Sequence, residues 1–241
     1  MIKPDVIVSQ PDSIDFPYWR HEIMRNRDFF GRILVVICKT YHTTSISNFL
    51  CLELAKIGAD VAVSPRLGSG QDWRNVAVNL CLPQVSSEKI LFLEQDFNFN
   101  SERFLPTALS QTTKIVGFKE GNEKASRFHP GFLLVDSDLV RRTSKSFGVV
   151  PDQCDHFGLF SKEIEALEVP TYLEDIGLAT PTDWEHLAGL TSNYLLVMSA
   201  QKPNHNVERF AKYNQICLEL AVEQSTIFRN YIKLAAGIKK S

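Results

Sequence analysis

The sequence predicts an α/β protein with a mostly parallel central sheet flanked by helices, followed by a mixed C-terminal part with a helical tail. Two observations support this prediction. Short β-branched or aromatic runs alternate with helical patterns between residues 5 and 136, which is the order expected of βαβ units. These runs are apolar almost throughout, as is typical of strands that are buried on both faces of a sheet.

The expected strands are residues 5–9, 32–39, 60–64, 89–95, 114–118 and 131–136. Helices are expected over 45–57, 72–82 and 101–110. The first of them ends at Gly58, and glycine is common directly after a helix. The other two open on Asp72 and Ser101, which are residue types that cap helices well.

The C-terminal part has a different pattern. It predicts a helix with an irregular start over 152–167, a shorter helix over 181–190, a strand over 193–199 and a long helical tail from Asn206. No internal repeat or Pro/Gly/Ser-rich linker divides the chain. We therefore expect one domain over 1–241, made of an N-terminal half (1–120), a C-terminal half (121–205) and the tail (206–241). The tail is expected to pack either on its own domain or against a second subunit of a homodimer.

Composition narrows the class of protein. The 26 basic and 28 acidic residues nearly cancel, so no large field favours nucleic acid or an anionic membrane as a partner. The five cysteines are odd in number and form no CxxC pair, a pattern that favours reduced thiols in a cytoplasmic protein. No secretory signal is expected at the N-terminus, and no apolar run approaches the ~20 residues of a transmembrane segment.

The stretch KILFLEQDFNF, residues 89–99, places two acids at the end of an apolar strand. Ligands of open α/β sheets bind beyond the carboxyl ends of the strands. Glu94 and Asp96 are separated by one residue, so in extended geometry their side chains point to the same side. Two such carboxylates suit Mg²⁺ or Mn²⁺. The alternative is a solvated strand end that caps the next helix.

The segment GSGQDWRNVAVN, residues 68–79, lies upstream of these acids. Three features follow one another in this part of the chain: a loop with glycine, an Arg-Asn pair that opens a helix, and a hydrophobic strand that ends in an acid-x-acid triplet. This order resembles the nucleotide-sugar-binding half of family 2 glycosyltransferases of the GT-A fold. The resemblance covers most of the chain coarsely and residues 68–97 most specifically, and it implies a single GT-A-type, Rossmann-like domain.

The resemblance also implies roles for individual residues. Asp96 matches the acid that binds the metal on the diphosphate of the donor. Glu94 stands at the first-acid position, which faces the ribose or sugar, and replaces the usual aspartate. Arg74 matches an arginine near the nucleotide or diphosphate, and its alternative is an ordinary surface arginine.

Further family positions fall in the C-terminal half. Asp155 fits the base that accepts the proton of the acceptor hydroxyl, with Asp152 as the second candidate, and helix capping is the non-catalytic alternative for Asp155. His205 stands where a third metal ligand is expected, and His186 is a second candidate for that position. His156 is a candidate for the lining of the acceptor pocket.

Other features fit a sugar site less specifically. No acid follows the second strand, where family members recognise uracil. The candidates for reading the base are then Asp12 after the first strand or the backbone, unless the base is not uracil. Of five aromatic residues near the expected site, we expect at least three to be core residues; they are Trp73, Phe97, Phe99, Phe157 and Phe160. The basic residues Arg141, Arg142 and Lys145 suit an anionic ligand or an ordinary solvated turn.

Three functions follow from this interpretation. The first is a Mn²⁺- or Mg²⁺-dependent glycosyltransferase that moves a sugar from a nucleoside-diphosphate donor to a glycan or other hydroxyl acceptor, with inversion implied by the resemblance. The second is a non-catalytic GT-A-like domain that binds a nucleotide sugar or a protein. A nucleotidyltransferase is a third and weaker possibility, because no glycine-rich phosphate loop follows the first strand.

Overall fold

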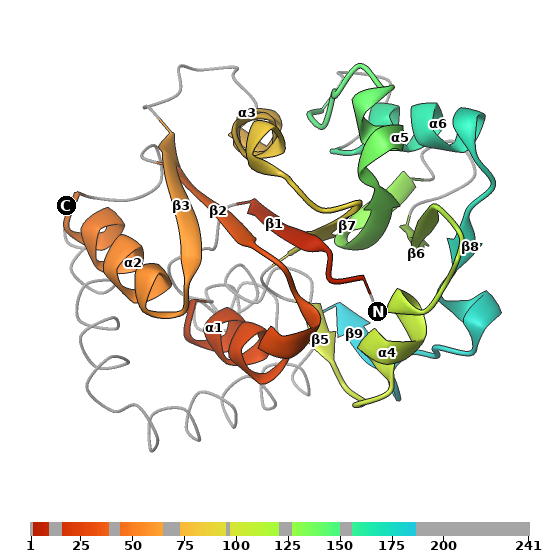
Figure 1. Ribbon diagram of the computed structural model, residues 1–241, viewed down its shortest axis with the longest axis horizontal. Helices are drawn as coiled ribbons and strands as arrows, with labels where there is room; N and C mark the ends of the chain where they lie inside the picture. Colours follow the sequence, from red (N-terminus) through yellow and green to blue (C-terminus); the bar gives the residue numbers. More distant parts are fainter. Residues whose placement is uncertain are drawn as a thin grey trace, which may run out of the picture.

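The structure is a computed structural model that describes residues 2–9, 16–38, 44–64, 73–94, 97–120, 127–149 and 156–186. These residues form a seven-stranded sheet, a two-stranded sheet and helices on both faces of the larger sheet (Figure 1). The predicted α/β class with a mostly parallel central sheet is confirmed.

The seven strands of the central sheet lie in the order β3-β2-β1-β4-β7-β6-β8. Their bounds are Asp5–Ser9 (β1), Ile33–Cys38 (β2), Ala59–Ser64 (β3), Lys89–Leu93 (β4), Ile115–Glu120 (β6), Arg127–Asp136 (β7) and Thr171–Tyr172 (β8). Strands β3, β2, β1 and β4 are parallel to one another. Strand β7 is antiparallel to both of its neighbours, β4 and β6, while β8 is parallel to β6. In this described sheet, β7 is therefore the strand of reversed direction.

Helices cover both faces of the sheet. Helices α1 (Phe16–Arg25), α2 (Thr44–Lys56) and α4 (Phe104–Leu109) lie on one face, and α3 (Trp73–Cys81), α5 (Ser137–Arg141) and α6 (Gly158–Leu167) lie on the other (Figure 1). The described residues also contain three short 3₁₀ helices: η1 (Arg27–Phe29), η2 (Leu82–Gln84) and η3 (Glu174–Ile176). The sheet is consequently buried on both sides, as its apolar strands predict.

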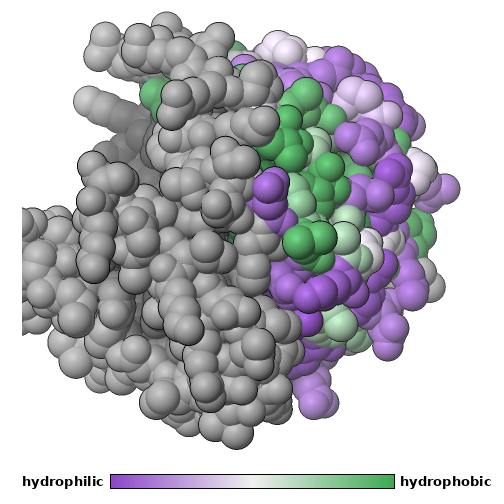
Figure 2. Space-filling model, turned by 90° about the vertical axis from the view of Figure 1, so that its left-hand side faces the viewer, coloured by the Kyte–Doolittle hydropathy of each residue, from purple (hydrophilic) through white to green (hydrophobic). Residues whose placement is uncertain are grey.

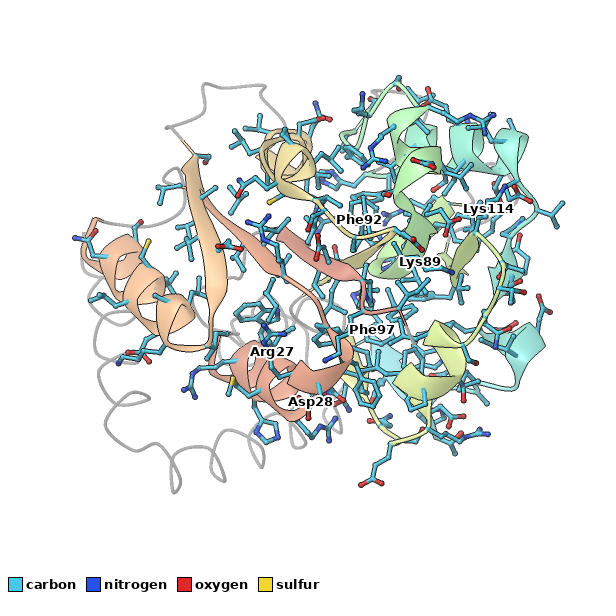
Figure 3. All side chains as sticks on the ribbon, in the orientation of Figure 1. Arg27, Asp28, Lys89, Phe92, Phe97 and Lys114 are labelled. Carbon is cyan, nitrogen blue, oxygen red and sulfur yellow. The ribbon has the colours of Figure 1, made fainter. Side chains whose placement is uncertain are left out.

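Alternation along the strands divides the core into two clusters. Val6 and Val8 of β1 pack in the cluster of α1, α2 and α4, whereas Ile7 between them packs in the cluster of α3, α5 and α6, as the two-residue period of a strand requires. Figure 3 shows the same separation for Phe92, on the side of α3 and α5, and Phe97, on the side of α1 and α4.

Most expected elements lie close to their observed positions. The first five strands begin and end within two residues of the prediction, and β7 ends as predicted but begins four residues earlier. Gly58 follows α2 with φ +69°, which confirms its expected role. Helix α6 begins at Gly158, later than expected, and α1 and α5 were not predicted. The expected strand over 193–199 and the tail from Asn206 lie outside the described residues.

Two expectations about helices are wrong. Ser101 does not cap the helix that follows it, because α4 begins at Phe104 and the Ser101 hydroxyl donates to Asp183. In place of the helix expected over 181–190, Trp184–His186 forms strand β9, which pairs antiparallel with β5 (Phe97–Phe99). This pairing joins segments far apart in the sequence, so no local pattern in the second segment could reveal it.

The carboxylate of Asp183 holds the start of β9 in place. Its two oxygens accept hydrogen bonds from Ser101 Oγ (2.8 Å), Arg103 Nε (2.7 Å), Arg103 Nη2 (2.6 Å) and the Ala179 amide (2.9 Å). The Arg103 hydrogen bonds, with those of Ser101 and Ala179, outweigh burial and hold the pKa of Asp183 well below its usual range. Only 2% of the Asp183 side chain is exposed, so these donors take the place of the water that would solvate an exposed carboxylate.

The surface of the described part is mixed. The side that carries α2 and β3 faces the viewer in Figure 2, where hydrophobic and hydrophilic residues lie side by side in the coloured part of the surface. Leu52 of α2, Val63 of β3 and Leu80 of α3 are exposed large hydrophobic residues. Within the described residues, no helix has both the length and the apolar character needed to span a bilayer.

Asp183→Asn should lower the free energy of unfolding by about 2–3 kcal/mol at neutral pH, because Arg103 and the other donors lose a charged acceptor. The pKa of Asp183 is depressed in the folded state, so its contribution is present above the ordinary aspartate pKa of about 3.9 and is lost as the pH falls below it. Urea unfolding of both proteins at several pH values should show the difference shrinking at acidic pH. A difference that does not depend on pH would contradict this account.

Candidate functional site

Four polar side chains meet beyond the carboxyl end of β4. Glu94 directly follows the last residue of β4, and Arg74 is the second residue of α3. His129 comes from β7 and His186 from β9. Ligand atoms of Glu94, His129 and His186 all lie within 4.8 Å of one another. We name these three residues the triad; three separate elements supply it.

Glu94 and Arg74 form an ion pair between Oε1 and Nη2, with 10% and 20% of their side chains exposed. Burial raises the pKa of Glu94, but the Arg74 guanidinium and the hydrogen bond from His186 outweigh it. The net pKa of Glu94 lies well below its usual range. The carboxylate is therefore ionised, which a buried acid can be only when opposite charge or hydrogen bonds compensate it.

The two histidines lie against the other oxygen of Glu94. His186 Nε2 is 3.1 Å from Oε2, and His129 Nδ1 is 3.7 Å from the same atom. The ring centroids of the histidines are 4.1 Å apart, and the ring of Phe118 stacks on His129 at 5.1 Å. His186 reaches this place because it pairs with Phe97 in the small sheet, three residues after Glu94.

Gly131 makes this close packing possible. Its amide donates to His129 Nδ1 at 2.9 Å, and its carbonyl accepts from the Glu94 amide at 3.3 Å. A Cβ atom at this position would lie 2.8 Å from His129 Nδ1 and 3.2 Å from His186 Cδ2. Because Nδ1 of His129 accepts this hydrogen bond, a neutral ring carries its proton on Nε2.

The triad has the donor types of a transition-metal site. One carboxylate and two imidazoles suit Mn²⁺ or Zn²⁺ better than Mg²⁺, which prefers oxygen ligands. His186 Nε2 is engaged with Glu94, and His129 Nδ1 with the Gly131 amide. An ion held through these atoms would therefore have to replace those hydrogen bonds.

The structure places three of the residues singled out in the sequence together: Arg74, Glu94 and His186. His129 was missed because the expected strand began at residue 131 and so excluded it, and Gly131 lay inside that strand with no sign of a role at the site. The other predicted site residues lie outside the described residues: Asp12, Asp96, Asp152, Asp155 and His205. Their roles stay predictions.

A side chain of β7 contacts the backbone of the segment that begins at His156. Arg127 Nη1 donates to the His156 carbonyl at 2.7 Å. Phe157 follows with φ 63°, a left-handed conformation that is unusual for a bulky residue. The ring of Phe157 lies 5.3 Å from that of Phe92.

Four of the five aromatic residues expected near the site are buried core residues: Phe97, Phe99, Phe157 and Phe160. The expectation that at least three would be core is confirmed. The side chain of Trp73 is not described. These phenylalanines are therefore not available to stack on a sugar or base.

Comparison with known proteins finds solved structures of similar fold. The mannosyltransferase PcManGT from Pyrobaculum calidifontis, solved with GDP-Man and Mn²⁺, has 13% identity and a TM-score of 0.54 over 100% of this chain and 76% of that chain. The 2-C-methyl-D-erythritol 4-phosphate cytidylyltransferase from Thermus thermophilus has 13% identity and a TM-score of 0.47 over 84% and 100% of the two chains. No protein-family model and no curated protein matches this chain. At this identity the likeness shows a GT-A-like fold and nothing further.

Gly131→Ala should disturb the triad, because the added methyl group would lie too close to both imidazoles. We expect the NMR signals of the His129 and His186 rings to shift and the melting temperature to fall. Gly58→Ala is the control, since its added methyl group meets no atom within 4 Å and only the positive φ is strained. If both variants left the histidine signals unchanged, the close packing around Gly131 would be refuted.

The Arg74–Glu94 pair should show a measurable coupling free energy. In a double-mutant cycle of Arg74→Met and Glu94→Gln, we expect about 1–2 kcal/mol of non-additivity in urea unfolding, since both side chains are largely buried. The exposed pair Arg141–Asp138, with 60% and 86% of the side chains exposed, is the control and should couple by less than about 0.5 kcal/mol. Additive effects in the Arg74–Glu94 cycle would show that the ion pair contributes nothing to stability.

Proposed function

We propose that this protein is a glycosyltransferase that moves a sugar from a nucleoside-diphosphate donor to an acceptor hydroxyl, at a metal site beyond the carboxyl end of β4. The observation that carries the proposal is the convergence of Arg74, Glu94, His129 and His186 at that end. The GT-A-like fold and the resemblance of residues 68–97 to family 2 glycosyltransferases agree with it.

The position of this convergence in the sheet supports a nucleotide site. Strand β1 has β2 on one side and β4 on the other, and the strand order changes direction between β1 and β4. Ligands of open α/β sheets bind at such a switch point, beyond the carboxyl ends of the strands. Glu94 follows one of these two strands, and Asp12, proposed to read the base of the donor, comes shortly after the other.

Arg74 is the group proposed to meet the diphosphate. A guanidinium presents a planar set of donors that matches phosphate oxygens, and it keeps its charge when partly buried. Its present partner is Glu94. Donor phosphates would therefore compete with the Glu94 carboxylate for the guanidinium.

We propose Mn²⁺ as the resident metal, with Mg²⁺ as the second choice, because the described donor set contains two imidazoles. Asp96 and Glu94 are the proposed carboxylate ligands. His186 and His129 offer nitrogen within reach of Glu94, and His205 is the proposed ligand from the C-terminal part. When bound, such an ion offsets the negative charge that grows on the departing nucleoside diphosphate.

The acceptor hydroxyl needs a base. We propose Asp155, with Asp152 as the second candidate, as the carboxylate that accepts its proton while the bond to the anomeric carbon forms. Direct attack of this kind inverts the anomeric centre. The Arg127 hydrogen bond to the His156 carbonyl holds the backbone one residue after Asp155.

A second candidate function is nucleotide-sugar or protein binding without catalysis. The engagement of both Glu94 oxygens, by Arg74 and by His186, favours it, because a closed ion pair leaves less room for a metal. Donor turnover decides between the two functions.

Binding of the donor should depend on the metal and on Asp96. In the presence of Mn²⁺, one or more nucleoside diphosphates should raise the melting temperature. At a ligand concentration of 100 Kd, binding adds about 2.7 kcal/mol to the free energy of unfolding. Asp96→Ala should abolish this protection. Asp138→Ala, an exposed acid on α5, is the control and should keep it.

Catalysis is tested separately with Asp155→Asn. We expect this variant to keep the metal-dependent protection and to lose donor turnover by about 100-fold or more. Protection without turnover by the wild-type protein, over a panel of donors and acceptors, would favour the non-catalytic function. Release of pyrophosphate from a nucleoside triphosphate and a sugar phosphate would instead identify a nucleotidyltransferase.

A further inference from the structure

A cavity of about 340 Å³ lies at the amino end of β4, the opposite end from Glu94. Its apolar walls come from η2 and the loop after it, the start of β4, and α5; they are Leu82, Pro83, Val85, Ile90 and Val140. Asn79, Ser137, Arg141 and Lys145 complete the described lining. Helices α3 and α5, which flank this space, lie on the same face of the sheet in Figure 1.

The charged residues in the described lining of this cavity are both basic. Arg141 and Lys145 are the charged residues among its described lining, and neither an aspartate nor a glutamate belongs to that lining. Arg141 also pairs with the exposed Asp138 at 2.7 Å. Within the described part of the chain, Lys145 makes no ion pair. The cavity thus combines an apolar interior with a cationic rim, as small-molecule sites with a few polar groups do.

The backbone at Lys145 gives a second, independent observation. Its φ is 57°, a left-handed conformation in which glycine or asparagine is the ordinary choice and lysine is strained. Neighbouring elements hold this turn in place: Asn79 Nδ2 donates to the Lys145 carbonyl (3.1 Å), and the Ser144 amide donates to Glu163 (2.8 Å). A long cationic side chain is therefore kept beside the cavity at a position where glycine would be more stable.

We infer that this cavity is a second binding site, for a small molecule with an apolar body and an anionic head. The apolar walls take the body, and the ammonium of Lys145, with Arg141 beside it, takes a carboxylate or a phosphate. The site is separate from the proposed transfer site, because the two lie at opposite ends of β4 and share no described residue.

The test uses four probes that share a phenyl body: phenylacetate, phenyl phosphate, phenethyl alcohol and phenethylamine. Binding to the full chain is measured by ligand-observed NMR. At least one of the two anions should bind with a dissociation constant at least about tenfold below that of the alcohol. The amine should not bind. The anion that binds more tightly identifies the head group. Equal binding of the alcohol and the anions, or no binding of any probe at millimolar concentration, would overturn the inference.

Lys145→Gly tests the role of the Lys145 side chain in binding without destabilising the fold. We expect the variant to melt at the same temperature as the wild type or higher, because the left-handed turn is relaxed, and to bind the anionic probe about tenfold more weakly. Lys145→Gln, which keeps a long side chain without the charge, should show the same loss of binding. Arg142→Gln, a neighbouring basic residue outside the cavity lining, is the control and should bind normally. Unchanged binding by both Lys145 variants would refute the assignment.

The two sites are told apart by competition. Mn²⁺ with a nucleoside diphosphate should not displace the phenyl probe from the wild-type protein, and Asp96→Ala should not weaken the probe. Displacement of the probe by the nucleotide would show that it occupies the transfer site and would overturn the inference of a second site.

Discussion

The pairing of β4 with β1 on one side and β7 on the other is the constraint on which the rest of the structure depends. Leu93, the last residue of β4, pairs with Val8 of β1 on one side and with Phe132 of β7 on the other. Because both faces of β4 are buried, its side chains belong to the core as far as Leu93. The next residue, Glu94, leaves the paired strand, and this explains how an acid can follow directly on a fully buried run.

Burial makes Glu94 dependent on its partners. An ionised carboxylate at this depth is stable only because Arg74 and His186 compensate its charge. The same compensation links stability to the proposed reaction. If a diphosphate binds Arg74 in place of Glu94, the Glu94 carboxylate needs another positive partner. A divalent metal would provide one. Donor and metal would then bind together more readily than either binds alone.

Helix α3 connects the two ends of β4. Arg74 in its first turn faces the triad, while Asn79 nearer its end lines the cavity at the other end and donates to the Lys145 carbonyl. Asn75 accepts a hydrogen bond from the Phe147 amide, so the helix is tied to the loop before α6 along its length. Helix α3 therefore contributes residues to both the proposed transfer site and the proposed second site, although the two sites share no described residue.

The sequence by itself determined the strands of the parallel part, the helix over 45–57 with Gly58, and the placing of Arg74 and Glu94 near one site. The strands, the helix and the place of Glu94 after a strand depend on local apolar patterns, which a sequence shows directly. Arg74 was placed near the site by the resemblance to family 2 glycosyltransferases. Only the tertiary structure decided that His129 and His186 join Glu94, that Trp184–His186 is a strand, and that Gly131 has to lack a side chain. These features arise where β7 and β9 are brought beside the end of β4 by pairings between segments far apart in the chain, and such pairings leave no periodic mark on either segment.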